Sequence, residues 1–128
     1  MNIPDNLRYT KDHEWVRIEG NKAVVGITDF AQNELGDVVF VELPAIGKKL
    51  AAHGNLAVIE SVKAVSDIFA PVAGTVSKVN EVLTDSPETV NQDPYGGGWI
   101  AELEMTDLSA ISGLLSAGEY EALIKEKA

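Results

Sequence analysis

Short runs in which hydrophobic and polar residues alternate account for most of the chain between residues 13 and 104. Alternation with a period of two residues is typical of β-strands that bury one face, and Gly, Pro, Asn and Asp between such runs indicate turns. The first two runs are expected to form a hairpin across residues 19–22. The pattern predicts a mostly β protein, with strands at residues 15–18, 23–27, 37–43, 56–60, 66–70, 74–79 and 99–104.

Helical signals are fewer and lie outside these strands. Thr28 is a typical N-cap for a helix over residues 29–35, and Gly36 would end that helix at its C′ position. Asp107 is expected to cap a second segment that runs to Leu115.

The end of the chain, about residues 107–127, is predicted to be a helical segment. Ser116 and Glu119 match a capping box, and the hydrophobic residues at 120, 123 and 124 would pack a helix onto the β core. Residues 84–98 are instead rich in Pro, Asp, Asn and Gly, which predicts a loop with one turn of helix after Pro87.

One lysine stands between two of the predicted strands. Lys63 lies in the run Val58-Ile59-Glu60-Ser61-Val62-Lys63-Ala64-Val65-Ser66-Asp67-Ile68. This run predicts a hairpin over about residues 55–72, with the lysine at the tip of a tight turn. A lysine there contributes little to packing and is often an ordinary surface residue. Another protein can, however, reach and modify its amine, so we interpret the chain as a carrier of a covalently attached group and not as an enzyme.

Length and composition limit the remaining classes. The chain of 128 residues is long enough for one domain with its own core, and no linker divides residues 1–128. The first residues lack the features of a signal or transit peptide, and no hydrophobic run approaches the roughly 18 residues of a membrane span. We therefore expect a cytoplasmic protein that contacts no membrane.

The charge of the chain is strongly negative, with 20 Asp and Glu against 10 Lys and Arg and a net charge of −10. Such a balance disfavours nucleic-acid binding, keeps a protein soluble and monomeric, and directs it toward basic partner surfaces. An ordinary solvated surface would have the same composition. Cysteine is absent, which excludes disulfides and thiolate chemistry, and we expect neither a metal site nor a catalytic residue.

The residues around the lysine, Glu60-Ser61-Val62-Lys63-Ala64, resemble the attachment sequence of lipoyl carriers. Over Tyr9 to Tyr120 the chain resembles the H-protein family of the glycine cleavage system, a group of the lipoyl/biotinyl-attachment family. Biotin carriers usually place methionines on both sides of the lysine, and acyltransferase-type lipoyl domains usually have Asp-Lys-Ala. In this chain Val62 and Ala64 flank Lys63, which favours lipoate over biotin and differs from the acyltransferase type. The segments that carry the likeness, in family order and spacing, are His13-Glu14-Trp15, residues 25–28, 35–44 and 66–68, residues 70–74, Val90-Asn91, Pro94-Tyr95 and residues 98–100.

This resemblance implies a fold and a cofactor. The fold would be a β-sandwich or flattened barrel of the lipoyl/biotinyl type, with short flanking helices and a C-terminal helix. The cofactor would be lipoate, joined to Lys63 as N6-lipoyl-lysine by a lipoate ligase or a lipoyl/octanoyl transferase. The elements that such an enzyme would recognise are Glu60, Ser61, Val62 and Ala64.

The resemblance also implies a role in glycine catabolism and one-carbon metabolism. A pyridoxal-phosphate glycine decarboxylase (P protein) would pass an aminomethyl group to the arm. A tetrahydrofolate-dependent aminomethyltransferase (T protein) would remove the methylene group, and a dihydrolipoyl dehydrogenase (L protein) would reoxidise the arm. An alternative is a lipoyl donor that supplies lipoyl groups to other lipoate-dependent enzymes.

A loaded arm would be an aliphatic chain with an ammonium group at its tip. A hydrophobic groove that ends in carboxylates would shelter it, because a cation that leaves water needs an opposite charge nearby. Glu14 and Asp67 match family positions near such a groove, and Asp12 and Glu34 are further candidates. Some relatives have histidine at position 34, so a carboxylate replaces a neutral donor there. Each of these carboxylates is also open to interpretation as a surface charge.

Other conspicuous residues are expected to be structural. His13 is expected to make a structural hydrogen bond, and Trp15 and Trp99 to line the core or the groove of the arm. The glycines at 96–98 predict a turn and not a phosphate-binding loop, because no Lys-Ser/Thr pair follows them.

Overall fold

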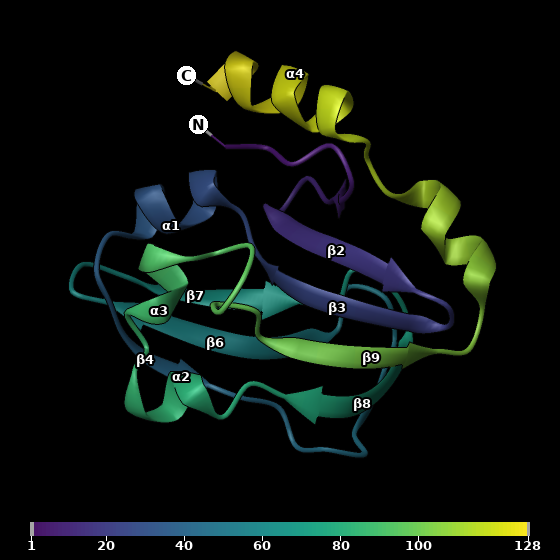
Figure 1. Ribbon diagram of the computed structural model, residues 1–128, viewed down its shortest axis with the longest axis horizontal. Coiled ribbons are helices and arrows are strands. Elements are labelled where there is room, and N and C mark those ends of the chain that lie inside the picture. Colours follow the sequence, from purple (N-terminus) through teal and green to yellow (C-terminus); the bar gives the residue numbers. More distant parts are fainter. Residues whose placement is uncertain (1, 128) are drawn as a thin grey trace.

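The computed structural model describes residues 2–127, and in it two antiparallel sheets face each other (Figure 1). The larger sheet has the strand order β1-β2-β3-β9-β8-β5, and the smaller has the order β4-β6-β7. The strands are β1 Arg8–Tyr9, β2 Glu14–Glu19, β3 Lys22–Ile27, β4 Val38–Glu42, β5 Lys49–Leu50, β6 Asn55–Ser61, β7 Val65–Phe69, β8 Gly74–Val79 and β9 Ala101–Met105. The helices are α1 Asp29–Leu35, α2 Val82–Asp85, α3 Thr89–Gln92, the 3₁₀ helix η1 Leu108–Gly113 and α4 Ala117–Lys127.

The core lies between the two sheets and follows from strand alternation. In the smaller sheet Val41 pairs with Ile59, and in the larger sheet Val25 pairs with Ala101; all four side chains are buried. Directly paired residues of antiparallel strands point to the same face of their sheet. Each of these pairs therefore adds hydrophobic surface to the interior between the two sheets. The expected mostly β sandwich is confirmed, and it is a sandwich rather than a barrel.

The larger sheet is covered on its outer face as well. A second hydrophobic cluster there joins the N-terminal segment and α4, and it contains Leu7, Tyr9, Trp15, Val24, Ala117, Tyr120 and Ile124. The ring of Tyr120 stacks on Tyr9 at 4.8 Å between centroids. Figure 1 shows α4 lying along the N-terminal segment beyond β2. Since both faces carry hydrophobic side chains, β2 and β3 have longer buried runs than simple alternation would give.

All three predicted caps are present, and at the start of η1 the Asp107 carboxylate accepts a hydrogen bond from the Ser109 N–H at 3.0 Å. The Thr28 hydroxyl accepts a hydrogen bond from the backbone N–H of Ala31 at 3.2 Å, at the start of α1. At α4 the Ser116 N–H donates to the Glu119 carboxylate at 2.9 Å, and the Glu119 N–H donates to the Ser116 hydroxyl at 3.2 Å. Both contacts satisfy N–H groups that a helix start leaves unpaired, so the capping-box prediction is confirmed.

Several element predictions need correction. The strand predicted at 99–104 begins at Ala101, because the Asn80 side-chain amide donates to the carbonyl oxygens of Gly97 and Trp99 at 2.7 and 2.8 Å. The segment after Asp107 is a 3₁₀ helix that ends at Gly113. The pattern missed β1, β5 and α2, which are too short to show a period. The helical turn after Pro87 is present as α3.

None of the helices between residues 2 and 127 is long and hydrophobic enough to cross a membrane.

The packing predicts different effects for two isoleucines. Ile59 is fully buried between the sheets, whereas Ile46 is 63% exposed. We expect Ile59→Ala to lower the free energy of unfolding by about 2–5 kcal/mol, because it removes buried methylene groups and leaves a cavity. Ile46→Ala, the same change at the surface, should cost less than about 0.5 kcal/mol. Urea denaturation measures both, and equal losses would contradict this placement of the core.

Candidate functional site

The turn between β6 and β7 presents Lys63 at one end of the molecule (Figure 1, left). Ser61 donates its backbone N–H to the Ala64 carbonyl at 2.8 Å, and its hydroxyl accepts from the N–H groups of Lys63 and Ala64 at 3.3 and 3.0 Å. Short hairpin turns usually contain residues with positive φ. None of residues 61–64 has a positive φ, because among the described non-glycine residues only His13 and His53 do. The Ser61 side chain therefore holds this turn in place.

The turn is also fixed against the end of α1. The Val62 N–H donates to the Asp37 carbonyl at 3.0 Å. Gly36, the C-cap of α1, has φ 78° and ψ −159°, a region of backbone space that is essentially restricted to glycine. A Cβ on Gly36 would lie 3.4 Å from Cε of Lys63. The stem of the lysine thus passes over the end of α1, although the residue as a whole is exposed.

A groove of about 370 Å³ begins beside this point, between α1 and β7. We call it the α1–β7 groove. Leu35, which lines it, directly precedes the glycine under the lysine stem, so a chain attached to the Lys63 amine can enter the groove. Its lining residues are Asp12, His13, Ile27, Phe30, Ala31, Glu34, Leu35, Ser66 and Ile68. Its wall is mostly hydrophobic, and two carboxylates are among its lining residues.

The four predicted shelter carboxylates occupy three different environments. Asp12 and Glu34 line the α1–β7 groove and are exposed. Asp67 lies between Ser66 and Ile68 on β7, so alternation turns its side chain to the opposite face, where it accepts a hydrogen bond from Asn55 Nδ2 at 3.3 Å. Glu14 is buried. The structure therefore brings together Asp12 and Glu34 in the groove and places Asp67 outside it.

Glu14 is a carboxylate with only 1% of its surface exposed. It accepts hydrogen bonds from the Thr10 hydroxyl at 2.7 Å and from the backbone N–H of Phe69 at 3.3 Å. Burial raises the pKa of Glu14 to about 7, although these two hydrogen bonds act in the opposite direction. Glu14 thereby connects the loop before β2, which carries Asp12, to the end of β7.

The expected structural hydrogen bond of His13 is confirmed. Its Nδ1 lies 2.8 Å from the hydroxyl of Tyr120, and its ring centroid lies 4.7 Å from that of Phe30 in the groove wall. The Tyr120 hydroxyl also lies 2.7 Å from the Thr28 hydroxyl at the start of α1. Tyr120 of the C-terminal helix therefore contacts both His13, in the groove wall, and the start of α1, the helix that forms one side of the groove.

Both tryptophans and the glycine run lie away from the groove lining. Trp15 is fully buried, and its Nε1–H donates to the Pro94 carbonyl at 2.8 Å. Trp99 is half-buried and packs against the second hydrophobic cluster. The glycines form a turn, as predicted: a Cβ on Gly98 would lie 2.8 Å from the Asp93 carbonyl oxygen.

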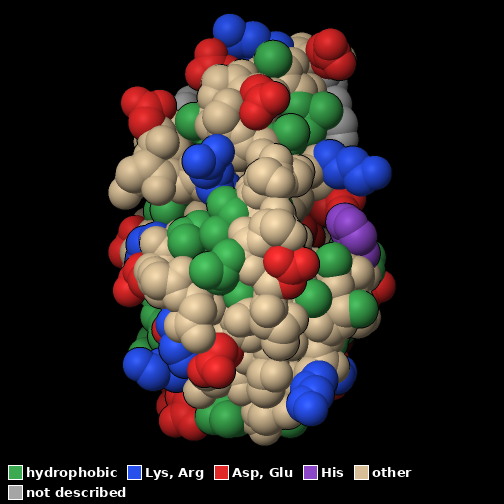
Figure 2. Space-filling model, turned by 90° about the vertical axis from the view of Figure 1, so that its right-hand side faces the viewer, with side chains coloured by type: hydrophobic (Ala, Val, Ile, Leu, Met, Phe, Trp, Pro, Cys, Tyr) green, Lys and Arg blue, Asp and Glu red, His purple; other side chains and the backbone are tan. Residues whose placement is uncertain are grey.

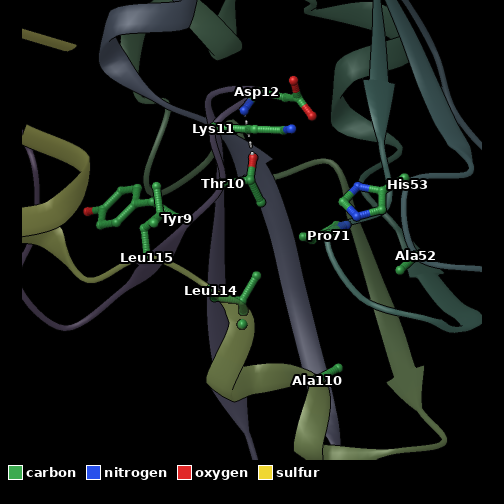
Figure 3. A pocket seen from close by; sticks show the side chains of 11 residues that line it. Tyr9, Thr10, Lys11, Asp12, Ala52, His53, Pro71, Ala110, Leu114 and Leu115 are labelled. Carbon is green, nitrogen blue, oxygen red and sulfur yellow. Dashed lines mark hydrogen bonds between the residues drawn. The ribbon is translucent and has the colours of Figure 1, made fainter. Parts of the chain in front are cut away.

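A second hollow, of about 310 Å³, lies toward the other end of the β6–β7 hairpin (Figure 3). Tyr9, Leu114 and Leu115 lie on one side of it, and His53 and Pro71 on the other. Asp12 also borders it. Because its hairpin-side residues precede β6 or follow β7, it is remote from the turn that carries Lys63.

Six groove residues were not assigned to a groove from the sequence: Ile27, Phe30, Ala31, Leu35, Ser66 and Ile68. Two signals were available: residues 31, 34 and 35 lie on one face of a helix, and residues 66 and 68 lie on one face of a strand. Neither signal shows that the two faces meet.

Comparisons with known proteins agree over nearly the whole chain. A family model described as "Glycine cleavage H-protein" matches residues 7–127. The glycine cleavage system H protein of Herpetosiphon aurantiacus is 58% identical over 127 residues, which cover 99% of this chain and 97% of that protein. That of Geobacillus thermodenitrificans is 52% identical over 126 residues, covering 98% and 99%. The crystal structure of a glycine cleavage system H protein from Mycobacterium marinum superimposes with a TM-score of 0.88 at 40% identity, covering 96% of this chain and 99% of that one.

The fold and the turn define a β-sandwich protein that presents one lysine at the tip of a hairpin. The chain belongs to the glycine cleavage H-protein family.

The burial of Glu14 predicts a pH-dependent contribution to stability. Its pKa of about 7 in the folded protein exceeds its ordinary value of 4.5, so its contribution is fully present below pH 4.5 and is lost as the pH rises to about 7. The free energy of unfolding of the wild type, minus that of Glu14→Gln, should therefore fall by roughly 3 kcal/mol across this range and stay level above it.

Urea denaturation at several pH values measures this difference, because the other titrating groups are common to both proteins. Glu126→Gln, an exposed change on α4, serves as the control for the substitution itself. A difference between wild type and Glu14→Gln that does not vary with pH would contradict the assignment.

Proposed function

We propose that this protein is the lipoylated carrier of the glycine cleavage system, with lipoate attached to Lys63 as N6-lipoyl-lysine. It carries the aminomethyl group from glycine decarboxylase to the tetrahydrofolate-dependent aminomethyltransferase, and its arm is then reoxidised by dihydrolipoyl dehydrogenase. The observation that carries this proposal is an exposed lysine at the tip of a fixed turn, in a chain that matches the H-protein family over residues 7–127.

The turn suits attachment of an acyl group. After losing a proton, the Lys63 amine attacks the activated carboxyl carbon of the acyl donor; a C–N bond forms and the bond to the leaving group breaks. Ser61 fixes the turn, so the backbone brings the amine to the enzyme in one orientation. Val62, 69% exposed, and Ala64 flank the amine, and Glu60 precedes the turn on β6. These neighbours are the proposed recognition elements for the lipoate ligase or lipoyl/octanoyl transferase.

The α1–β7 groove suits the attached arm. The lipoyl group supplies a dithiolane at the end of an aliphatic chain, which is the redox sulfur that this cysteine-free protein lacks. Phe30, Leu35 and Ile68 offer a hydrophobic wall beside the lysine stem, and Asp12 and Glu34 offer negative charge to an ammonium group. Glu14 and Thr10 hold the loop that carries Asp12. Because Asp67 faces away from the groove lining, we propose the shelter without it.

Lipoylation should depend on Lys63 alone. Incubation with lipoate ligase, lipoate and ATP is expected to add one lipoyl group to the wild type, as seen by intact mass. Lys63→Ala should gain none, because no other amine occupies the turn. Lys49→Ala, at an exposed lysine in β5, is the matched control and should be modified like the wild type. A wild type that gains no mass, with a ligase active on another carrier, would overturn the proposal.

Reconstitution tests the role of the modified protein. With the P, T and L proteins, glycine, tetrahydrofolate and NAD⁺, the lipoylated protein should support glycine-dependent NADH formation, which stops when any one component is omitted. The lipoylated protein alone should show no turnover. If glycine decarboxylase does not load the arm, but a lipoyl transferase accepts the protein as a donor, the lipoyl-donor function replaces the carrier function.

A further inference from the structure

The outer face of the small sheet is made by two rows of paired residues. Phe40 pairs with Glu60 and Glu60 with Val65; in the second row Glu42, Val58 and Asp67 are paired in the same way. The single row between them points inward, as the buried pair Val41 and Ile59 shows. Phe40, Glu60 and Val65 therefore share the face that points away from the core, and their row directly precedes the turn of Lys63.

This outer face exposes hydrophobic side chains. Phe40 is 50% exposed and Val65 is 67% exposed, and Val62 in the adjoining turn is 69% exposed. Val39, at the β-bulge of β4, is 52% exposed. These four are more than half of the large hydrophobic residues exposed anywhere in the described chain, and all four lie on β4, on β7 or in the turn. Such a concentration indicates a surface that another molecule covers.

The charge on this face has one sign. Glu42, Glu60 and Asp67 stand among the hydrophobic residues, and β4, β6 and β7 contain no Lys or Arg. Two lysines border this face: Lys63 in the turn, and Lys48, which lines a hollow with Glu42 and Val58. The large sheet differs, because two of its lysines pair with carboxylates: Lys22 with Glu104 at 2.8 Å and Lys78 with Glu102 at 4.0 Å.

The end of the molecule opposite the turn is also different. Figure 2 shows it with positive, negative and hydrophobic side chains interspersed and with no continuous patch of one charge. The outer face of the small sheet combines carboxylates with exposed hydrophobic side chains. A partner for this face must therefore bring positive charge and a hydrophobic pocket. A second copy of the chain would set carboxylates against carboxylates, because the three strands of this face contain no Lys or Arg, so self-association does not satisfy it.

We propose that the outer face of β4, β6 and β7 is the docking surface for the enzyme that acylates Lys63, and that this enzyme receives Phe40 and Val65 in a hydrophobic pocket rimmed by Lys or Arg. The inference rests on the proposed function. The reacting atom in attachment is the Lys63 amine, at the end of this face, so the acylating enzyme must contact its immediate surroundings. Enzymes that act on the loaded arm react instead at its far end.

Acylation kinetics test the docking surface with two pairs of variants. Phe40→Ala removes the proposed anchor, and Leu108→Ala, at a residue 52% exposed in η1, is its control. Glu42→Arg reverses a charge on the face without touching the turn, and Glu126→Arg on α4 is its control. Thermal melting confirms that all four variants fold. The probe is lipoate ligase with lipoate and ATP, and the readout is kcat and KM for single acyl addition by intact mass.

We expect Phe40→Ala and Glu42→Arg each to lower kcat/KM by about tenfold, mainly through KM, while both controls stay within about twofold of the wild type. The deficit of Glu42→Arg should shrink in high salt, and that of Phe40→Ala should persist. Face variants that are acylated like the wild type would overturn the docking surface, even if they load poorly with glycine decarboxylase. Failure of the wild type itself to be acylated would instead overturn the proposed function.

Discussion

The site depends on the hydrogen bonds that Ser61 makes within its own turn. Its N–H reaches the Ala64 carbonyl, and its hydroxyl receives the N–H groups of Lys63 and Ala64. Because β6 is paired on both sides, with β4 and β7, the turn cannot shift without breaking both ladders. A flexible arm needs such a fixed base, since the position of its attachment determines which surfaces the arm can reach.

The groove beside the turn is built from distant parts of the chain. Tyr120 on α4 contacts His13 and Thr28, which lie before β2 and at the start of α1. Glu14 connects the same loop to the end of β7 through Phe69. The C-terminal helix thus contributes to the site without entering it. The outer face of the small sheet needs no such support, because strand pairing alone arranges its residues.

Local patterns predicted the parts of the site that depend on local structure. The hairpin, the position of Lys63 and the cap residues Ser116 and Glu119 follow from alternation and capping rules. The groove depends on contacts between segments far apart in the chain, so sequence reasoning proposed its carboxylates without knowing which ones meet. Alternation puts Ser66 and Asp67 on opposite faces of β7, but it does not show which of these faces borders the groove. The sequence also did not indicate that Glu14 is buried. The strand that it begins packs on both faces, but a single polar residue in such a strand has the same local pattern as a surface position.

Moving the lysine by one position tests most directly whether the geometry of the turn selects the amine. The double variant Val62→Lys with Lys63→Val keeps the composition and charge of the chain and places the amine one residue earlier in the turn. Both residues are exposed, so the fold should tolerate the exchange. We expect lipoate ligase to modify the wild type and to leave the exchanged variant unmodified, as measured by intact mass. Modification of the exchanged variant at the wild-type rate would contradict it.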